Sequence, residues 1–370
     1  MRVQWRPLAL ALLVACTPTP PAPTPAPAPA PAPARNAAPE PAERVWPVMG
    51  TMLRVVAWES DPDTAAAVLR AARAEVVRVD SLMSTYRDDS DLSRVNRAAG
   101  TGEWTHVSPE TLEVLLASLE YARSSDGAFD PTVGPLVDVW GFYRESGAMP
   151  PAAALDSAGA LVDWRRVEVR ADVRLVRLPL AGMRLDFGAI AKGYAVDLAL
   201  AAARRAGAGR AMIDLGGNIG VLGDAPAGES WPFGLRHPRH PESSFAVIAA
   251  ESGVVATSGD YERYFVHDGV RYAHIVDPRT GWPVQGVASV SVLAPTGVAS
   301  DALSTTLFVL GVERGCAVAA GLPGVAAVWV LAPDVDREEA PLRAVVGGPL
   351  ADRVEVAANV ELAVCAAAAR

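Results

Sequence analysis

The sequence predicts an α+β fold, with largely antiparallel sheets flanked by helices in one compact domain that can consist of two fused subdomains. Apolar residues recur at helical spacing through 64–82, which predicts a long amphipathic helix. Ser108, Pro109 and Glu110 are the residue types of an N-cap, a first helical position and an acidic first turn, so a second helix begins there. Short β-prone runs, mostly bounded by Gly, Pro or polar residues, predict strands at 53–57, 167–169, 246–250, 287–293 and 325–331.

Residues 1–15 have the layout of a lipoprotein signal peptide. Arg2 and Arg6 precede an apolar stretch, 8–14, and a small residue stands directly before Cys16. The apolar stretch is too short to remain as a transmembrane helix. A small residue followed by Cys suits a peptidase that cleaves before a lipidated thiol, so we expect Cys16 to become a lipidated N-terminal residue. The alternative is a secretory signal without lipidation, in which Cys16 occurs by chance.

Residues 16–43 predict a tether between this anchor and a folded domain, 44–370. From 17 to about 42 the chain is almost only Pro, Ala and Thr, a composition that cannot build a core and favours polyproline II. Such a semi-rigid spacer would hold the domain away from a membrane surface. Together the two features predict an exported protein, lipid-anchored to the bacterial membrane and facing the periplasm or the cell exterior.

Composition and missing motifs exclude several functions. A net charge of −9 argues against a nucleic-acid surface, which needs a basic stripe to neutralise phosphates. No GxGxxG opens a helix after a strand and no Walker loop occurs, so the common nucleotide folds are not expected. Besides Cys16 the chain has only Cys316 and Cys365, without metal-ligand spacing. We expect ordinary structural cysteines, with a disulfide between them as the alternative.

Asp301 and Thr305 stand four residues apart among small residues, a spacing that places both on one face of a helix. One carboxylate and one hydroxyl are hard oxygen ligands, too few for calcium but suited to magnesium, which keeps waters and takes further oxygens from a phosphate substrate. The alternative is that Asp301 caps the helix and Thr305 packs inward, and the spacing alone favours this alternative.

A glycine-rich turn at 185–197 joins an apolar strand end to a helix. Backbone can approach a ligand closely at such glycines. A helix that begins near Ala189 would direct amide groups toward an anion, and Lys192 could add charge. The alternative is a structural turn with a solvated lysine.

Three other polar segments follow apolar runs. The loop 271–281 sets His274 among Asp, Arg and Thr beside Pro and Gly, which favours a chemical role over a core histidine. Asp130 precedes a proline, so the chain is extended or turned there and presents Phe129 and Asp130 to a cleft. Turn chemistry alone can explain 256–261.

The order of these segments carries more information than any one of them. Together they resemble the ApbE family, the FAD:protein FMN transferases, many of which are lipoproteins. The resemblance spans nearly the whole predicted domain. The segments that carry it are 49–51, 84–96, 129–139, 185–197, 215–218, 257–264, 274–281 and 299–311.

The resemblance implies a set of site residues. Magnesium would be held by the side chains of Asp301 and Thr305 and by the main-chain carbonyl of Ala189. His274 matches the histidine of a family loop and is the candidate that helps deprotonate an acceptor hydroxyl. Ala273 stands where many members have a second histidine, so the identity of the base is open. The implied FAD contacts are Met49, Tyr86, Ala128, Phe129, Asp130, Asp186, Lys192 and Ile275.

The resemblance also implies a reaction. A Ser or Thr hydroxyl of an acceptor protein attacks the flavin-side phosphorus of FAD, which leaves FMN in a phosphoester and releases AMP. The family suggests subunits of membrane redox complexes as acceptors. No acceptor-type Asp-Gly-x-Thr-x-Thr segment occurs, so the chain is not expected to flavinylate itself. The alternatives are a metal-dependent FAD pyrophosphatase that yields FMN and AMP, and a flavin-binding lipoprotein without catalysis.

Overall fold

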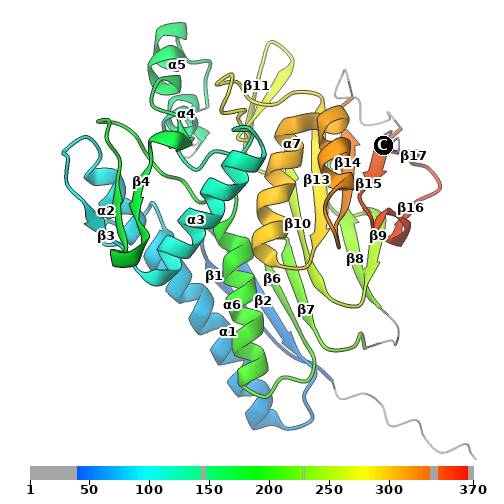
Figure 1. Cartoon of the computed structure of the whole chain (residues 1–370). Coiled ribbons are helices and arrows are strands. Elements are labelled where there is room, and N and C mark those ends of the chain that lie inside the picture. Colours follow the sequence, from blue (N-terminus) through cyan, green and yellow to red (C-terminus); the bar gives the residue numbers. More distant parts are fainter. Residues whose placement is uncertain (1–39, 143–146, 227, 229, 334–340, 366–370) are drawn as a thin grey trace, which may run out of the picture. The chain divides into compact units, whose positions relative to one another are not determined.

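The computed structural model describes residues 40–142, 147–226, 228, 230–333 and 341–365 (Figure 1). These residues belong to one compact unit, 38–370. The predicted signal peptide, Cys16 and nearly all of the tether lie outside the described residues.

Nine strands of the described residues form the main sheet. Neighbouring strands are antiparallel except for the last two, which are parallel, so the predicted α+β fold with largely antiparallel sheet is confirmed. In spatial order the strands are β1 (Ala42–Val48), β2 (Thr51–Ala57), β6 (Ala211–Leu215), β7 (Asn218–Leu222), β10 (Gly253–Gly259), β13 (Val287–Ala294), β14 (Ala326–Leu331), β15 (Arg343–Gly347) and β17 (Glu361–Val364).

Three long helices cover one face of this sheet (Figure 1). They are α1 (Pro62–Met83), α6 (Ala191–Arg205) and α7 (Gly297–Ala320). Helix α6 packs between the other two, with α1 on the side of β1 and β2 and α7 on β10 and β13. The helices therefore bring residues near 192 and residues near 301 into contact.

A second, three-stranded sheet packs its apolar residues with those of β13, β14 and β15. It consists of β8 (Trp231–Arg236), β9 (Ser244–Ala250) and β16 (Val354–Val356). Strand β14 shows why the predicted run 325–331 is apolar throughout. Val328 packs with the second sheet and Trp329 packs with α7, because successive side chains of a strand point to opposite faces and both faces are buried here.

The predicted helix starts and strands are confirmed. Helix α1 begins at Pro62, capped by Asp61, and α3 (Pro109–Ser124) begins after Ser108, whose side chain accepts from the Thr111 amide. The predicted strands correspond to β2, β4 (Glu168–Arg170), β9, β13 and β14. The remaining elements are α2 (Asp91–Arg97), β3 (Thr105–His106), α4 (Gly134–Trp140), α5 (Ala152–Gly159), η2 (Trp164–Arg166), η3 (Ala171–Val173), β5 (Leu175–Arg177), β11 (Tyr264–His267), β12 (Val270–Ala273) and η4 (Ala351–Arg353).

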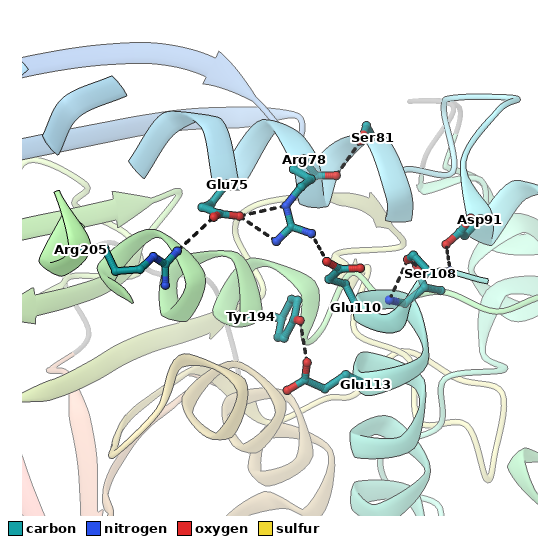
Figure 2. Close-up of polar contacts among 10 residues, drawn as sticks. Glu75, Arg78, Ser81, Asp91, Ser108, Glu110, Glu113, Tyr194 and Arg205 are labelled. Carbon is teal, nitrogen blue, oxygen red and sulfur yellow. Dashed lines mark hydrogen bonds and ion pairs between the residues drawn. The ribbon is translucent and has the colours of Figure 1, made fainter. Parts of the chain in front are cut away.

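A polar network fixes α3 against α1 and α6 (Figure 2). Arg78 of α1 pairs with Glu110 in the first turn of α3 and, at 2.7 Å, with Glu75. Tyr194 of α6 donates its hydroxyl to Glu113 of α3 at 2.8 Å. The loop that follows α3 is held separately beside the turn that precedes α6, because the Asp186 amide donates to the Pro131 carbonyl at 2.7 Å.

Helix α7 is the one helix of the described residues with the length and hydropathy of a membrane span, but half of that window is buried within the unit. It packs on β10 and β13 and serves as a core helix. Its Cys316 forms a disulfide with Cys365, directly after β17. The expectation of two unpaired structural cysteines is therefore wrong, because the sheet brings residues 49 apart in sequence to a Cα separation of 5.5 Å.

Candidate active site

Asp301 lies in the second turn of α7 and its side chain is 6% exposed. It is not the cap of the helix. The Thr296 side chain accepts from the Ala299 amide at 3.2 Å, and Asp197 of α6 accepts from the amides of Gly297 and Val298 at 2.6 and 3.0 Å. The capping alternative for Asp301 is wrong, because other side chains already satisfy the first amides of α7.

The carboxylate of Asp301 faces α6. Its Oδ1 lies 3.3 Å from Nζ of Lys192, and its Oδ2 accepts from the Gly193 amide at 3.0 Å. The two helices can approach so closely because Gly193 and Gly297 face each other. A Cβ on either would overlap the carbonyl oxygen of the other.

Lys192 also connects Asp301 to the glycine-rich turn. Its Nζ donates to the Gly188 carbonyl at 2.9 Å, one residue before Ala189. Asp186 shapes this turn, since its Oδ1 accepts from the Gly188 amide at 2.7 Å and its own amide donates to the Pro131 carbonyl. The structure thus brings Asp186, Ala189, Lys192 and Asp301 into one site.

Helix α6 begins at Ala191, close to the predicted start near Ala189. Its first amides are less available than the sequence suggested. The Ala191 amide donates to the Phe187 carbonyl at 2.8 Å, and the Gly193 amide is taken by Asp301. The positive charge that this turn offers an anion therefore comes mainly from Lys192.

Thr305 lies one turn after Asp301 on α7. It contacts Ser258, which belongs to the segment 256–261 that turn chemistry alone could explain. Its Oγ1 is 3.1 Å from Oγ of Ser258, at the end of β10, and Ser258 is 2.9 Å from Oγ of Ser304. Sequence reasoning missed Ser258. The available signal was a Thr-Ser-Gly-Asp segment directly after an apolar run.

His274 follows β12 and is half-buried. Its Nδ1 is enclosed and has no hydrogen-bond partner among the described residues. Burial, together with the positive charges of Arg263 and Lys192, lowers the pKa of His274 to about 4. The imidazole is therefore neutral at neutral pH, and it lies close enough to Lys192 for an electrostatic interaction.

The expected FAD contacts differ in their surroundings. Ala128, Phe129 and Ile275 are buried. Asp130 is buried too, and burial raises its pKa; its Oδ1 accepts from Thr132 and its Oδ2 from the Trp164 amide. This carboxylate therefore shapes its own loop.

Tyr86 is exposed, whereas Met49 is half-buried. Tyr86 is 71% exposed and borders a hollow of about 540 Å³, which Phe142 and residues 262–265 also line. Met49 is half-buried in a turn with φ of 51°. Hydrogen bonds and charge connect Asp186, Lys192, Asp301, Thr305 and His274, whereas no described hydrogen bond connects Met49 to them.

The donor set suits a hard cation. Within the described ranges no three His, Cys, Asp or Glu side chains gather, which leaves one carboxylate, one hydroxyl and a main-chain carbonyl at this site. Asp301 is nearly enclosed, and among the described residues it forms an ion pair with the ammonium of Lys192. All three donors are oxygens, which fits magnesium and does not fit zinc.

Known proteins resemble this chain in sequence and in fold. The model of the ApbE family matches residues 49–329. An FAD:protein FMN transferase of Treponema pallidum is 38% identical over 306 residues, which covers 78% of this chain and 83% of the relative. The crystal structure of an ApbE protein from Thermotoga maritima aligns with a TM-score of 0.73 at 33% identity, over 79% of this chain and 94% of that one.

A histidine-to-glycine variant of the flavin transferase ApbE from Vibrio cholerae aligns with a TM-score of 0.72 at 30% identity, over 83% of this chain and 97% of that one. Family model, sequence and fold agree over most of the chain. This chain belongs to the ApbE family, and it is an enzyme of the transferase class.

Proposed function

We propose that this chain transfers the FMN half of FAD to a Ser or Thr hydroxyl of an acceptor protein, with Mg²⁺, and releases AMP. The observation that carries the proposal is the buried Asp301, with Lys192 on one side and Thr305 one turn further along α7. The relatives named FAD:protein FMN transferase support FAD as the substrate, FMN as the transferred group and a protein as the acceptor.

Each residue has a physical task in this reaction. Phosphoryl transfer requires chiefly positioning and neutralisation of charge. Asp301, Thr305 and the Ala189 carbonyl would hold Mg²⁺, which supplies charge neutralisation at the pyrophosphate when bound. Lys192 adds a second cation beside the same phosphates, and the Gly188 carbonyl orients it.

His274 is the proposed base. Its imidazole is neutral at neutral pH, so it can accept a proton from the acceptor hydroxyl. The pyrophosphate of bound FAD would bring negative charge beside Lys192 and Arg263, the two cations that lower the pKa of His274. FAD binding would therefore raise that pKa and make the imidazole a stronger base.

The decisive experiment incubates the purified compact unit, 38–370, with FAD, MgCl₂ and a candidate acceptor, and analyses the acceptor by mass spectrometry. The proposal expects a covalent FMN adduct on Ser or Thr together with AMP, and no adduct when EDTA is present. Free FMN and AMP without an adduct, whichever acceptor is used, would assign the chain as an FAD pyrophosphatase. Bound but unconverted FAD would make it a flavin carrier.

We also propose that the protein is exported and anchored through Cys16, so that it faces the periplasm or the cell exterior and meets membrane-bound acceptors there. The disulfide between Cys316 and Cys365 supports an oxidising compartment. Cys16→Ser should leave the activity of the purified protein unchanged and release it from membranes. A Cys16→Ser protein that stays in the membrane fraction after a high-salt wash would show a different anchor.

A further inference from the structure

Three hydroxyl groups and one carbonyl form a continuous chain of hydrogen bonds beside Asp301. Oγ1 of Thr305 is 3.1 Å from Oγ of Ser258, which is 2.9 Å from Oγ of Ser304. Ser304 in turn donates to the main-chain carbonyl of Asp301 at 2.8 Å. Ser258 belongs to β10, whereas the other residues belong to α7, so this chain of hydrogen bonds joins strand and helix beside Asp301.

Counting protons gives this hydroxyl chain a direction. Each hydroxyl has one proton to donate and two lone pairs with which to accept. Ser304 uses its proton on the Asp301 carbonyl, so it can only accept from Ser258. Ser258 has then used its own proton and can only accept from Thr305. Thr305 is consequently the donor at the end of the chain, and both its lone pairs are left for another partner.

We propose that Ser258 is a positioning residue, which accepts the hydroxyl proton of Thr305 and so directs the lone pairs of Thr305 toward a divalent cation. A hydroxyl can bind a cation only through its lone pairs, with its proton turned away. A threonine on a helix has a competing option, which is to rotate and donate to the carbonyl one turn earlier. Ser258 offers a better-placed acceptor and removes that choice. This inference rests on the metal site of the proposed function.

The surrounding structure holds Ser258 in place for this task. Its backbone pairs with Val290 of β13. Two residues later, Asp260 is held by Arg239 through two hydrogen bonds of 2.7 and 2.8 Å, and the Asp260 amide donates to the Ala288 carbonyl. The end of β10 is thus fixed on both sides, and the Ser258 hydroxyl is presented to α7 without a flexible segment.

The test measures the binding of MgCl₂ alone to the full-length protein by isothermal titration calorimetry, without FAD, and the rise in melting temperature that MgCl₂ produces. Groups that orient metal ligands typically contribute 10- to 100-fold in affinity. We expect Ser258→Ala to weaken Mg²⁺ binding by about that factor and to lose most of the rise in melting temperature. Ser258→Thr, which keeps the hydroxyl, should restore binding.

Ser291→Ala is the matched control. Ser291 of β13 makes a 2.8 Å hydroxyl contact with Thr257, the neighbour of Ser258 on β10, and this contact is separate from the hydroxyl chain. Removing it should change the melting temperature without metal about as much as Ser258→Ala does, and should leave Mg²⁺ affinity unchanged. Equal losses of Mg²⁺ affinity in the two variants would show that both act through the fold and would overturn the inference.

Ser304→Ala keeps the inference testable if Ser258→Ala fails to fold. Without its acceptor, Ser258 is free to donate to Thr305, so Mg²⁺ affinity should fall, though less than in Ser258→Ala. Wild-type Mg²⁺ affinity in both variants would refute the role of the hydroxyl chain and leave the transfer reaction standing. If the wild-type protein forms the FMN adduct but binds no Mg²⁺, both the metal site and the role of Ser258 are wrong.

Discussion

The ammonium group of Lys192 lies 3.3 and 3.5 Å from the two carboxylate oxygens of Asp301 and 2.9 Å from the carbonyl oxygen of Gly188. These are the oxygen types that a magnesium ion prefers. In the proposed function a divalent cation and Lys192 would therefore compete for Asp301, unless the lysine turned toward the phosphates of a bound substrate. The pair would then link the binding of metal to the binding of FAD.

Replacing Lys192 by Met tests this competition. Loss of one positive charge at ion-pair distance should raise Mg²⁺ affinity without FAD by about tenfold, which lies between the effects expected in water and in a protein site. FAD affinity should fall, because a cation beside the pyrophosphate is lost. Titration calorimetry with each ligand measures both, and Lys192→Arg is the control that keeps the charge. An unchanged or weaker Mg²⁺ affinity in Lys192→Met would contradict competition.

Asp301→Ala should abolish transfer and leave the fold intact, because it removes the one charged side chain that would hold the metal. FAD binding should weaken only in part, since Lys192 remains. Circular dichroism checks the fold and adduct formation measures the activity. Near wild-type, magnesium-dependent turnover in this variant would remove the basis of the metal assignment.

His274→Ala should lower the single-turnover transfer rate by roughly 10²- to 10⁴-fold, the usual contribution of a general base. FAD dissociation should change little. If His274 instead orients the loop 277–281 or contacts the flavin, rate and affinity should fall together. A large loss of FAD binding with intact chemistry in the bound state would therefore refute the role as base.

The pH dependence follows from the same histidine. Because the pKa of His274 is lowered to about 4, kcat/KM of the free enzyme should show no histidine-dependent fall between pH 8 and about 5. The same lowered pKa makes the free energy of unfolding depend on pH. His274 takes up a proton near pH 6.5 in the unfolded chain but only near pH 4 in the folded chain. The contribution of neutral His274 to the free energy of unfolding is therefore fully present above pH 6.5 and is lost as the pH falls to 4. Chemical denaturation of wild type and His274→Gln across this range measures the difference.

Gly193→Ala should destabilise the protein by about 1–3 kcal/mol or more, because the added methyl group overlaps the Gly297 carbonyl and presses on Asp301. Mg²⁺ binding should weaken as well, since the two helices must separate. Gly159→Ala in α5 is the control, as its Cβ meets no atom within 4 Å. Equal stability of both variants in urea denaturation would argue against the close helix contact.

The disulfide between Cys316 and Cys365 should contribute about 4 kcal/mol, as expected for closing a loop with a sequence separation of 49. Reduction should lower the melting temperature and free β17, which is an exposed strand at the edge of the main sheet. The double variant Cys316→Ser/Cys365→Ser should have the melting temperature of the reduced protein, and reductant should not change that temperature. Both thiols reacting with iodoacetamide in protein isolated without reductant would show that the bond does not form.

Local sequence determined the elements that depend on neighbouring residues. Ser108 caps α3 because the amide that it satisfies is only three residues away, at Thr111. The spacing of Asp301 and Thr305 placed both on one helix face, and α7 carries both. The FAD contacts and the Ala189 metal ligand came from the family resemblance, whereas Asp301 and Thr305 were already candidates from their spacing. All these roles stay predictions.

Only the tertiary structure decided which distant groups meet. Lys192 and Asp301 are 109 residues apart, and they pair because α6 and α7 cross at two glycines. The start of α7 depends on Asp197 of α6, which is why the sequence alone favoured Asp301 as its cap. Ser258 reaches Thr305, and Cys316 reaches Cys365, through the packing of α7 on the main sheet. Periodicity and capping depend on residues that are close in sequence. These contacts depend instead on how the sheet and the helices pack, which no local sequence pattern predicts.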